Sequence, residues 1–550
     1  MSGWVAQLMP HLMVVPILLP MLTAALMLLM GEGKRPIKAA LGTGSALLGL
    51  GVAVALLLWV DGCGRAVYLP GNWPAPFGIA LVVDRLSALM LVLASTVGLC
   101  AVLFASARWD KAGVHFYPLM QLQLMGLAGA FLTGDLFNLF VFFEILLAAS
   151  YGLLLHGSGR PRVGASLHYV AINLGASALF LIGASMLYGV TGTLNMADLS
   201  MRAALVPAAD RGLFDAAAGI LAVAFLAKAA AWPLNFWLVP AYAAATAPVG
   251  AIFALLTKVG VYALVRMGTL LFAGGPAPGA QGGVLLVFGL VTGMLGALGM
   301  LGSQRLGYLA GFSVVVSSGT LMAALGFGRW ALTGSALFYL LSSVLVAAAL
   351  FLLIDLLERW RNSGTTVDDL APFLSPSLQA DQDVNLDDDE ERLVGRPFPA
   401  STALLGLAFL ACTLLVAGLP PLSSFVGKLG MLSATVGTQA GEGPITWRAW
   451  LFVLLLLGGG LASLIGLTRA GIRFFWSAAP REAPRLRLAE ALPVLALLAA
   501  CLALTAGAGP VMRYTHETAQ ALHAPEAYVD DVLDAPTVGK ERPLGARCEP

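Results

Sequence analysis

Four ionisable residues stand in segments that are otherwise apolar. Glu144 lies in FNLFVFFEILLAAS, Lys228 in AVAFLAKAAAWPLNFW, Lys258 in AIFALLTKVGVYAL and Lys428 in PLSSFVGKLGML. One such charge at the centre of a membrane helix costs roughly 2.5–3.5 kcal/mol even on the lenient insertion scale. Ionisable residues inside a membrane segment typically mark a proton or ion pathway. We therefore predict that this carboxylate and these three amines carry protons across a membrane.

Prolines interrupt two of these segments. Pro233 follows Lys228 within five residues, and the pair Pro420 and Pro421 precedes Lys428. Proline removes a backbone donor and disrupts the helical hydrogen bonds, and a broken helix at membrane depth is tolerated where it is buried in protein or lines a cavity. Two broken segments with a lysine each predict an internal repeat, and such a pair indicates the ion site of a transporter.

Each candidate also has a purely structural interpretation. Glu144 and a lysine could form a static ion pair, although buried pairs stabilise poorly relative to apolar packing. Lys228 could extend toward the membrane surface, but it lies in the middle of its span. Lys258, in an uninterrupted helix, is a relay candidate that could instead be a satisfied lysine of the bundle. His168, in SLHYVAIN, is a secondary relay candidate, although a hydrogen-bonded histidine inside a helix is the more frequent case.

The composition indicates a polytopic membrane protein. Of the 550 residues 59% are hydrophobic and 11% are charged, whereas soluble domains carry about 25% charged residues. A net charge of +1 and the lack of a basic patch argue against a nucleic-acid partner. The five cysteines show no metal-binding spacing, and we find no nucleophile–base pair, phosphate-binding loop or redox motif. We predict no enzymatic activity, no cofactor and no metal site.

Runs of about 20 apolar residues predict about fourteen transmembrane helices. They lie at 12–31, 38–60, 79–106, 116–134, 136–156, 164–190, 216–238, 247–273, 283–303, 305–327, 332–357, 400–438 (one broken span), 449–470 and 489–508. With the first loop in the cytoplasm, seventeen lysines and arginines fall on that side and five on the other. The positive-inside rule therefore places both termini outside. Asp84 opens one helix, where we expect it to act as a cap.

Several stretches resemble one transporter family. GDLFNLFVFFEILLAASYGLLLHG, AKAAAWPLNFWLVPAY, APVGAIFALLTKVGVYALVR and GLPPLSSFVGK look like the D subunit of the Mrp-type (Pha/Mnh) multisubunit monovalent cation/proton antiporter. That subunit is similar in turn to the antiporter-like proton-pumping subunits of respiratory complex I. The match covers most of residues 75–475. It implies an all-α fold of fourteen helices, with two five-helix inverted repeats and with helices seven and twelve discontinuous.

The resemblance also assigns roles to the buried charges. The key glutamate of the family would be Glu144, the lysine of broken helix seven Lys228, the central lysine of helix eight Lys258 and the lysine of helix twelve Lys428.

Two departures from the superfamily stand out. Asn235 in PLNFWLV stands where the complex I relatives have a histidine. FYLLSSVLVAAALFLL has Ser342, Ser343 and Ala347 where some superfamily members carry a histidine or lysine. We therefore expect the central relay to use serines and water, which favours the antiporter over the redox-driven relative.

The expected organisation follows from the spans and the resemblance. Helices one to three occupy 1–115, the first repeat 116–273, the second repeat 283–470, the last helix 471–508 and a polar tail 509–550. The second repeat includes the loop 358–399, whose acidic stretch 381–391 we interpret as a solvated insertion, with a cation-attracting role as the alternative. We expect the protein in a bacterial inner membrane, in contact with lipid and with the other subunits of a complex.

These features predict a proton-translocating subunit of a Na⁺ or K⁺/proton antiporter, with protons passing along Glu144, Lys228, Lys258 and Lys428. The chain has no oxygen-rich cage of the kind that hard cations require, so the expected cargo of this chain is the proton. The main alternative is a redox-coupled proton-pumping subunit of a complex I or membrane-hydrogenase-like assembly. A membrane scaffold with functionally silent charges is a third possibility.

Overall fold

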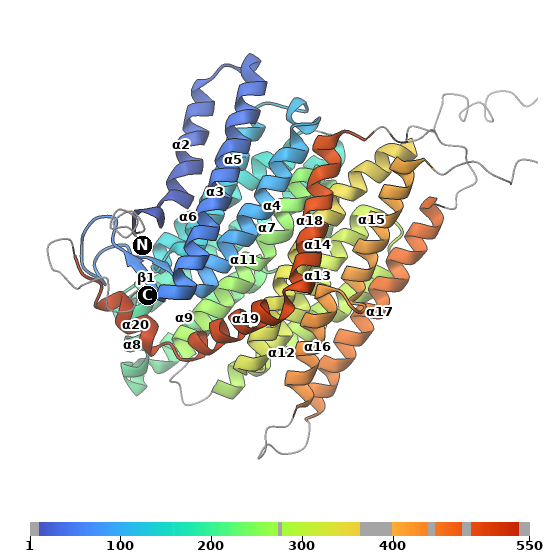
Figure 1. Ribbon diagram of the computed structural model, residues 1–550. Helices are drawn as coiled ribbons and strands as arrows, with labels where there is room; N and C mark the ends of the chain where they lie inside the picture. The colour runs from blue at the N-terminus through green and yellow to red at the C-terminus, as the bar shows by residue number, and fades with distance from the viewer. Residues whose placement is uncertain are drawn as a thin grey trace, which may run out of the picture.

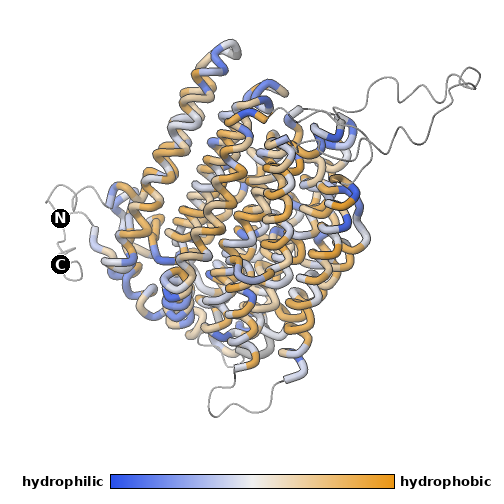
Figure 2. The backbone as a smooth tube through the Cα atoms, turned by 45° about the vertical axis from the view of Figure 1, so that its right-hand side comes forward, coloured by the Kyte–Doolittle hydropathy of each residue, from blue (hydrophilic) through white to orange (hydrophobic). Residues whose placement is uncertain are grey.

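The computed structural model describes residues 10–157, 159–272, 278–362, 399–437, 446–475, 484 and 486–537. Within these residues 11 helices are long and apolar enough to cross a membrane, and two shorter apolar helices accompany them. The helices run side by side (Figure 1), with apolar residues along their lengths and hydrophilic residues gathered at their two ends (Figure 2). The expectation of an all-α polytopic membrane protein is confirmed. The figure of fourteen crossings stays a prediction.

The N-terminal part contains three long helices and a small strand pair. Its elements are α2 (Val15–Leu29), η1 (Glu32–Lys34), α3 (Arg35–Cys63), β1 (Ala66–Tyr68), β2 (Leu81–Val83), α4 (Arg85–Ala105) and η2 (Trp109–Lys111). β1 and β2 pair in antiparallel fashion, which corrects the helix expected from residue 79. The helix begins only at Arg85 because Asp84 caps it, its side chain accepting from the Ser87 N–H at 2.8 Å. Strands of three residues are too short to leave a readable alternation in the sequence.

The next elements include the spans predicted between residues 116 and 273 and one helix, α8, that was not predicted. They are α5 (Phe116–Leu132), α6 (Leu136–Leu155), α7 (Arg160–Thr191), α8 (Met196–Leu205), α9 (Ala208–Lys228), α10 (Leu238–Ala244) and α11 (Ala247–Phe272). The span expected at 216–238 is in fact divided. Its first helix, α9, ends at Lys228, and its second, α10, begins only at Leu238.

The following part has a matching interruption. Its elements are α12 (Pro278–Gly302), α13 (Leu306–Leu325), α14 (Trp330–Asn362), α15 (Ala400–Ala417), α16 (Ser423–Val436) and α17 (Trp447–Phe475). The broken span expected at 400–438 is α15 followed by α16, with Pro420 and Pro421 between them. The acidic stretch 381–391 lies outside the described residues.

The C-terminal part departs from the expected polar tail. After α18 (Leu488–Ala506) come α19 (Ala508–His523) and α20 (Glu526–Leu533). α19 packs mainly on α14 and also touches α4, α11 and α18, while α20 packs on α8 and β1. Figure 1 shows α19 lying across the bundle rather than along it. The criterion of a 20-residue apolar run places residues 509–533 in the tail, because it misses an amphipathic helix that lies on a surface.

Both described ends of the chain lie on one face of the bundle. The Tyr68 hydroxyl of β1 is 3.5 Å from Nδ1 of His11, and Arg65 forms an ion pair with Asp531 of α20 at 3.3 Å. We call this side the terminal face, and the opposite side, where α14 ends at Asn362, the loop face.

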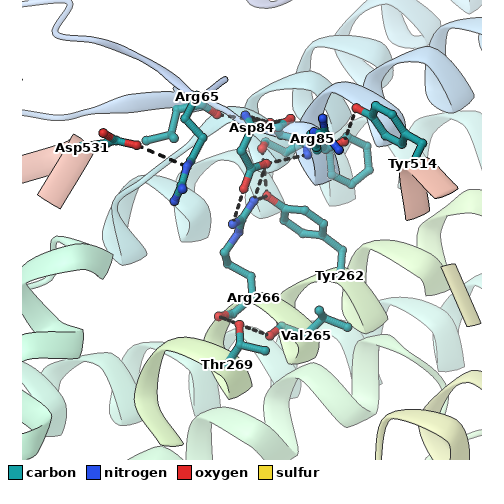
Figure 3. A network of polar contacts seen from close by, with 12 residues as sticks. Arg65, Asp84, Arg85, Tyr262, Val265, Arg266, Thr269, Tyr514 and Asp531 are labelled. Atoms are coloured by element: carbon teal, nitrogen blue, oxygen red, sulfur yellow. Dashed lines mark hydrogen bonds and ion pairs between the residues drawn. The ribbon is translucent and has the colours of Figure 1, made fainter. Parts of the chain in front are cut away.

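A buried ion pair anchors α11 at the terminal face (Figure 3). Arg266 donates to Asp84 through both terminal nitrogens, at 2.6 and 2.8 Å. Its guanidinium also lies 5.2 Å from the centre of the Tyr528 ring of α20. The Tyr514 hydroxyl of α19 donates to the Arg85 carbonyl at 3.0 Å. Asp84 therefore caps α4 as expected, and it also connects α4 to α11 and the C-terminal helices.

Candidate functional site

Glu144 and Lys228 lie close together but are joined through a third residue. Ser177 of α7 donates its hydroxyl hydrogen to Oε1 of Glu144 on α6, and Nζ of Lys228 donates to the same Ser177 oxygen at 3.3 Å. Nζ also lies 5.0 Å from the centre of the Phe143 ring. Among the residues that the structure describes, no direct Glu144–Lys228 ion pair falls within 4.0 Å. The expected neighbours are thus brought together, with a hydroxyl between them.

Lys228 is the last residue of α9, at the start of the break. The carbonyl end of a helix carries a partial negative charge that favours a cation, so the C-terminal end of α9 stabilises the ammonium of Lys228. Ala230 adopts a left-handed φ of 55°, which redirects the backbone, and Pro233 supplies no N–H to continue the helix. The Trp232 N–H instead donates to the Thr292 hydroxyl of α12 at 2.8 Å. The break is therefore held by a side chain from the other half of the bundle.

Lys258 sits near the middle of α11 and is 1% exposed. Its Nζ donates to Oγ of Ser318 on α13 at 2.9 Å, and no carboxylate lies within 4.0 Å of it in the described part of the chain. A Cβ added at Gly260 would come within 2.6 Å of the Ala229 nitrogen. The missing side chain at Gly260 therefore lets α11 approach the break that follows Lys228.

A series of serines extends from this point toward the second break. Ser317, next to Ser318 on α13, donates to Oγ of Ser343 on α14 at 2.9 Å. On the same helix, Oγ of Ser342 lies 2.8 Å from Oγ of Ser423 and 2.7 Å from Oγ of Ser424, at the start of α16. Ser342 and Ser343 thus lie in a cluster of buried hydroxyls, and their role in a relay stays a prediction.

Lys428 lies in α16, and its side chain reaches back to the second break. Its Nζ donates to the Ala417 carbonyl at the end of α15 at 2.7 Å. An added Cβ at Gly418 would lie 2.9 Å from Nζ, and one at Gly460 would lie 3.3 Å from it. Both lysines are thus associated with the C-terminal end of a half-helix: Lys228 is the last residue of α9, and the Lys428 ammonium donates to a carbonyl at the end of α15. Ser424 precedes Lys428 by four residues, so the two side chains lie on one face of α16.

The structure does not bring His168 to the buried lysines. His168 is exposed on α7, and its Nδ1 lies 3.2 Å from the Gly164 carbonyl. It lines a cavity of about 590 Å³ with Trp237, Arg305 and Glu358 toward the loop face. This position suits an entrance better than an interior step.

The sequence missed Ser177 altogether. Serine is common in membrane helices, and the segment GASALF of α7 contains no charge or proline that would single it out. The only signal is its pairing with two charges on other helices, which needs the tertiary structure. Among the described residues, no group of three histidine, cysteine or acidic side chains could hold a metal ion.

The chain is similar to known proteins along nearly its whole length. Residues 133–375 match the family described as "NADH:quinone oxidoreductase/Mrp antiporter, TM". The chain is 49% identical to a probable K(+)/H(+) antiporter D subunit of Rhizobium meliloti, over 98% of this chain and 100% of the relative. It is 31% identical to a Na(+)/H(+) antiporter D subunit of Alkalihalophilus pseudofirmus, over 96% and 100%.

A solved structure matches along the same length. A chain in the Mrp complex from Dietzia sp. DQ12-45-1b aligns with a TM-score of 0.77 and 27% identity, over 97% of this chain and 100% of that one. The resemblance read from the sequence motifs is thus confirmed. The chain belongs to the D-subunit family of Mrp-type monovalent cation/proton antiporters.

Proposed function

We propose that this chain is the proton-translocating subunit of a multisubunit monovalent cation/proton antiporter, and therefore a secondary transporter rather than an enzyme. One observation carries the proposal: ionisable groups and hydroxyls, most of them fully buried, form a series through both halves of the bundle. Glu144 begins the series and Lys428 ends it. The names of the relatives support the same function, since both are antiporter D subunits.

The route has three segments. Protons load the Glu144–Ser177–Lys228 group, pass to Lys258 and its serine partners, and reach Lys428 at the second break. Direct hydrogen bonds join the members of the first segment. In the other two segments they join Lys258 to Ser318, Ser317 to Ser343, and Ser342 to Ser423 and Ser424, and we propose that water completes the remaining steps, as it does where buried polar groups need further partners. The Thr257 hydroxyl beside Lys258, buried without a hydrogen bond in the described part of the chain, offers one such water a site.

The energy that a membrane potential supplies is similar in size to the cost of placing a charge inside the membrane. One charge that crosses 100 mV gains about 2.3 kcal/mol, which is of the same order as the cost of a charged residue in a membrane helix. Because each lysine is held by a helix end or a hydroxyl, the charged form has partners at every stage. Membrane potential and cation gradient together are therefore an adequate driving force for moving one proton along the series.

His168, Ser342 and Ser343 take the secondary positions. Ser342 and Ser343 connect Lys258 to Lys428 as the central hydroxyls. His168 serves the entrance, where Glu358 and Arg305 line the same cavity. The bias of basic residues assigns the loop face to the cytoplasm and both termini to the outside of a bacterial inner membrane.

The chain acts within a complex. The solved relative comes from an Mrp complex, and the proposed partners are the other subunits of such a complex, membrane lipid, protons and Na⁺ or K⁺, with no nucleic acid and no cofactor. The two repeats at 116–273 and 283–470 each contribute one broken helix, α9–α10 and α15–α16, to the route.

A redox-coupled proton pump is the second candidate. The matching family description includes NADH:quinone oxidoreductase, and the same buried charges would serve that assembly. Asn235 replaces the histidine of complex I relatives in the break itself, which favours the antiporter. Neighbouring genes that encode redox subunits, rather than small antiporter subunits, would select the pump.

The test is cation-dependent proton movement in everted vesicles that contain the whole complex. Glu144→Gln and Lys228→Ala are compared with Lys111→Ala, a change at an exposed residue. The proposal expects that adding Na⁺ or K⁺ collapses the pH gradient in wild type and in the control but not in the first two variants, with the complex assembled in all four. Unchanged exchange in both variants would leave the charges with a structural role only.

A further inference from the structure

The hydroxyl of Ser177 stands between the only acid and the first amine of the route. It donates to Oε1 of Glu144 and accepts from Nζ of Lys228. Ser177 is 5% exposed, so bulk water is kept from the contact. The two charged groups thus communicate through one oxygen atom rather than through direct contact.

Ser177 does not make the bond that a helical serine or threonine usually makes. Hydroxyls in membrane helices commonly donate to the carbonyl three or four residues earlier, as do Thr96 to Val92 and Ser463 to Gly459 in this chain. Ser177 instead directs its hydrogen to another helix. A side chain that gives up the local bond for a carboxylate on α6 is aimed at that carboxylate.

The packing of α7 holds Ser177 in place. An added Cβ at Gly183 would lie 2.9 Å from the Leu221 nitrogen of α9, so the two backbones approach closely at that point. This approach keeps the Ser177 oxygen within reach of Lys228. α7 packs on both α6 and α9, and the Ser177 hydroxyl contacts Glu144 of α6 and Lys228 of α9, so it lies where the three helices meet.

We infer that Ser177 transfers a proton between Lys228 and Glu144, so that the pair can become neutral without moving apart. In this step one N–H bond of the Lys228 ammonium breaks and an O–H bond forms at Ser177. At the same time the original Ser177 O–H bond breaks and an O–H bond forms at Glu144. The products are a neutral amine, the serine hydroxyl and a carboxylic acid, so atoms and charge balance. This inference rests on the proposed function and specifies how its first segment works.

The step has a consequence for the lysine. Proton transfer removes the positive charge beside Phe143, and with it the attraction of the ammonium to the ring. The neutral amine of Lys228 can then accept a new proton, while Glu144 holds the proton that it received from the Ser177 hydroxyl. Ser177 therefore couples proton binding at Glu144 to proton binding at Lys228, and a residue without a hydroxyl at position 177 breaks that coupling.

The experiment uses the whole complex in everted vesicles with four variants. Ser177→Thr keeps the hydroxyl, whereas Ser177→Val has nearly the same shape without it, so the comparison isolates the hydroxyl. We expect Ser177→Val and Ser177→Ala to lose cation-dependent proton movement at least about tenfold and Ser177→Thr to keep most of it. Glu144→Gln serves as the reference for loss of the route.

A second readout is infrared difference spectroscopy of the complex between high and low pH, in H₂O and in D₂O. Wild type and Ser177→Thr should show a carboxylic-acid band that is absent from Glu144→Gln. In Ser177→Val this band should be lost or shifted. Wild-type transport in Ser177→Val and Ser177→Ala, or equal loss in Thr and Val variants, would overturn the role of Ser177 while leaving the route intact. Full activity of Glu144→Gln would instead overturn the proposed function itself.

Discussion

Arg266 holds Asp84 in a two-pronged contact, with its terminal nitrogens 2.6 and 2.8 Å from the two carboxylate oxygens. Arg266 is two turns beyond Lys258 on α11, while Asp84 caps α4. Burial alone raises the pKa of Asp84, but the charge of Arg266 and its hydrogen bonds outweigh burial and hold that pKa below the ordinary value of 3.8. The helix that carries the central lysine is thus fixed at its terminal-face end.

Replacing Asp84 by Asn is expected to destabilise the protein by about 3–5 kcal/mol, because it leaves the Arg266 charge buried without a counter-charge. The measurement is thermal unfolding of the purified complex. Asp61→Asn is the control, since its ion pair with Arg85 is largely exposed and such pairs contribute about 1 kcal/mol or less. Equal stability of the two variants would contradict the assigned importance of the buried pair.

The same pair makes stability depend on pH in the acidic range. Because the pKa of Asp84 is lower in the folded state than in the unfolded state, its stabilisation is fully present above the unfolded value near 3.8. It is lost as the pH falls through the folded value. Asp84→Asn should flatten this part of the stability curve, measured as melting temperature against pH.

Gly460→Ala is expected to disturb Lys428. An added Cβ would lie 2.7 Å from the Ala417 oxygen and 3.3 Å from Nζ of Lys428, so the ammonium must leave its carbonyl partner. We expect antiport to fall by about tenfold or more in a complex that still assembles. Gly458→Ala is the matched control on the same helix, because nothing lies within 4 Å of its added Cβ. Wild-type transport in Gly460→Ala would argue against Lys428 at this position in the route.

Ser342→Ala removes the hydroxyl that contacts Ser423 and Ser424. Loss of one or two buried hydrogen bonds costs about 1–3 kcal/mol of stability, but loss of a relay group should reduce cation-dependent proton movement by about tenfold or more. Ser463→Ala, which loses only a bond to the Gly459 carbonyl, is the control. If both variants transport equally well, the serines serve packing rather than proton transfer.

Two histidines of α19 contact hydroxyls of α14, and we expect them to make the docking of α19 depend on pH. Nε2 of His516 lies 3.3 Å from the Ser335 hydroxyl, and Nε2 of His523 lies 3.1 Å from the Thr333 hydroxyl, both on α14. Burial lowers the pKa of each histidine below the ordinary 6.5. Docking of α19 is therefore fully stabilised above about pH 6.5 and weakens as the pH falls from there toward the folded values.

Hydrogen exchange of residues 508–523 in the complex measures this response. We expect faster exchange at about pH 5.5 than at about pH 7.5, after correction for the intrinsic rate, in the range where histidine takes up a proton. The double variant His516→Gln, His523→Gln keeps a hydrogen-bonding side chain without the charge and should lose the difference. A pH-independent wild type would contradict the effect.

The charged residues that are costly to bury could be predicted from the sequence, but the residues of other helices that contact them could not. Lys228, Lys258 and Lys428 stand out because a charge in an apolar run has a large cost wherever the chain folds. Ser177 and Ser318 have no such cost, and their importance comes only from which residue of another helix they face. The breaks at Pro233 and Pro421 were readable because proline acts locally.

The errors have related causes. The short β1–β2 pair and the surface helix α19 fall below the length at which apolar runs identify an element. The apolar sequence neighbours of His168 suggest an interior position, but a rotation of only part of a turn about the helix axis decides whether a side chain faces the bundle or its outside.

α19 lies across the terminal face and packs mainly on α14, with further contacts to α4, α11 and α18. A helix of 16 residues is about 24 Å long. α19 therefore connects α11, which packs on the first broken helix, to α14, which packs on the second. If α11 and α14 slide past each other at the terminal face, α19 must bend or lose its contacts with one of them. The C-terminal helices therefore limit how far the two halves of the route can move independently.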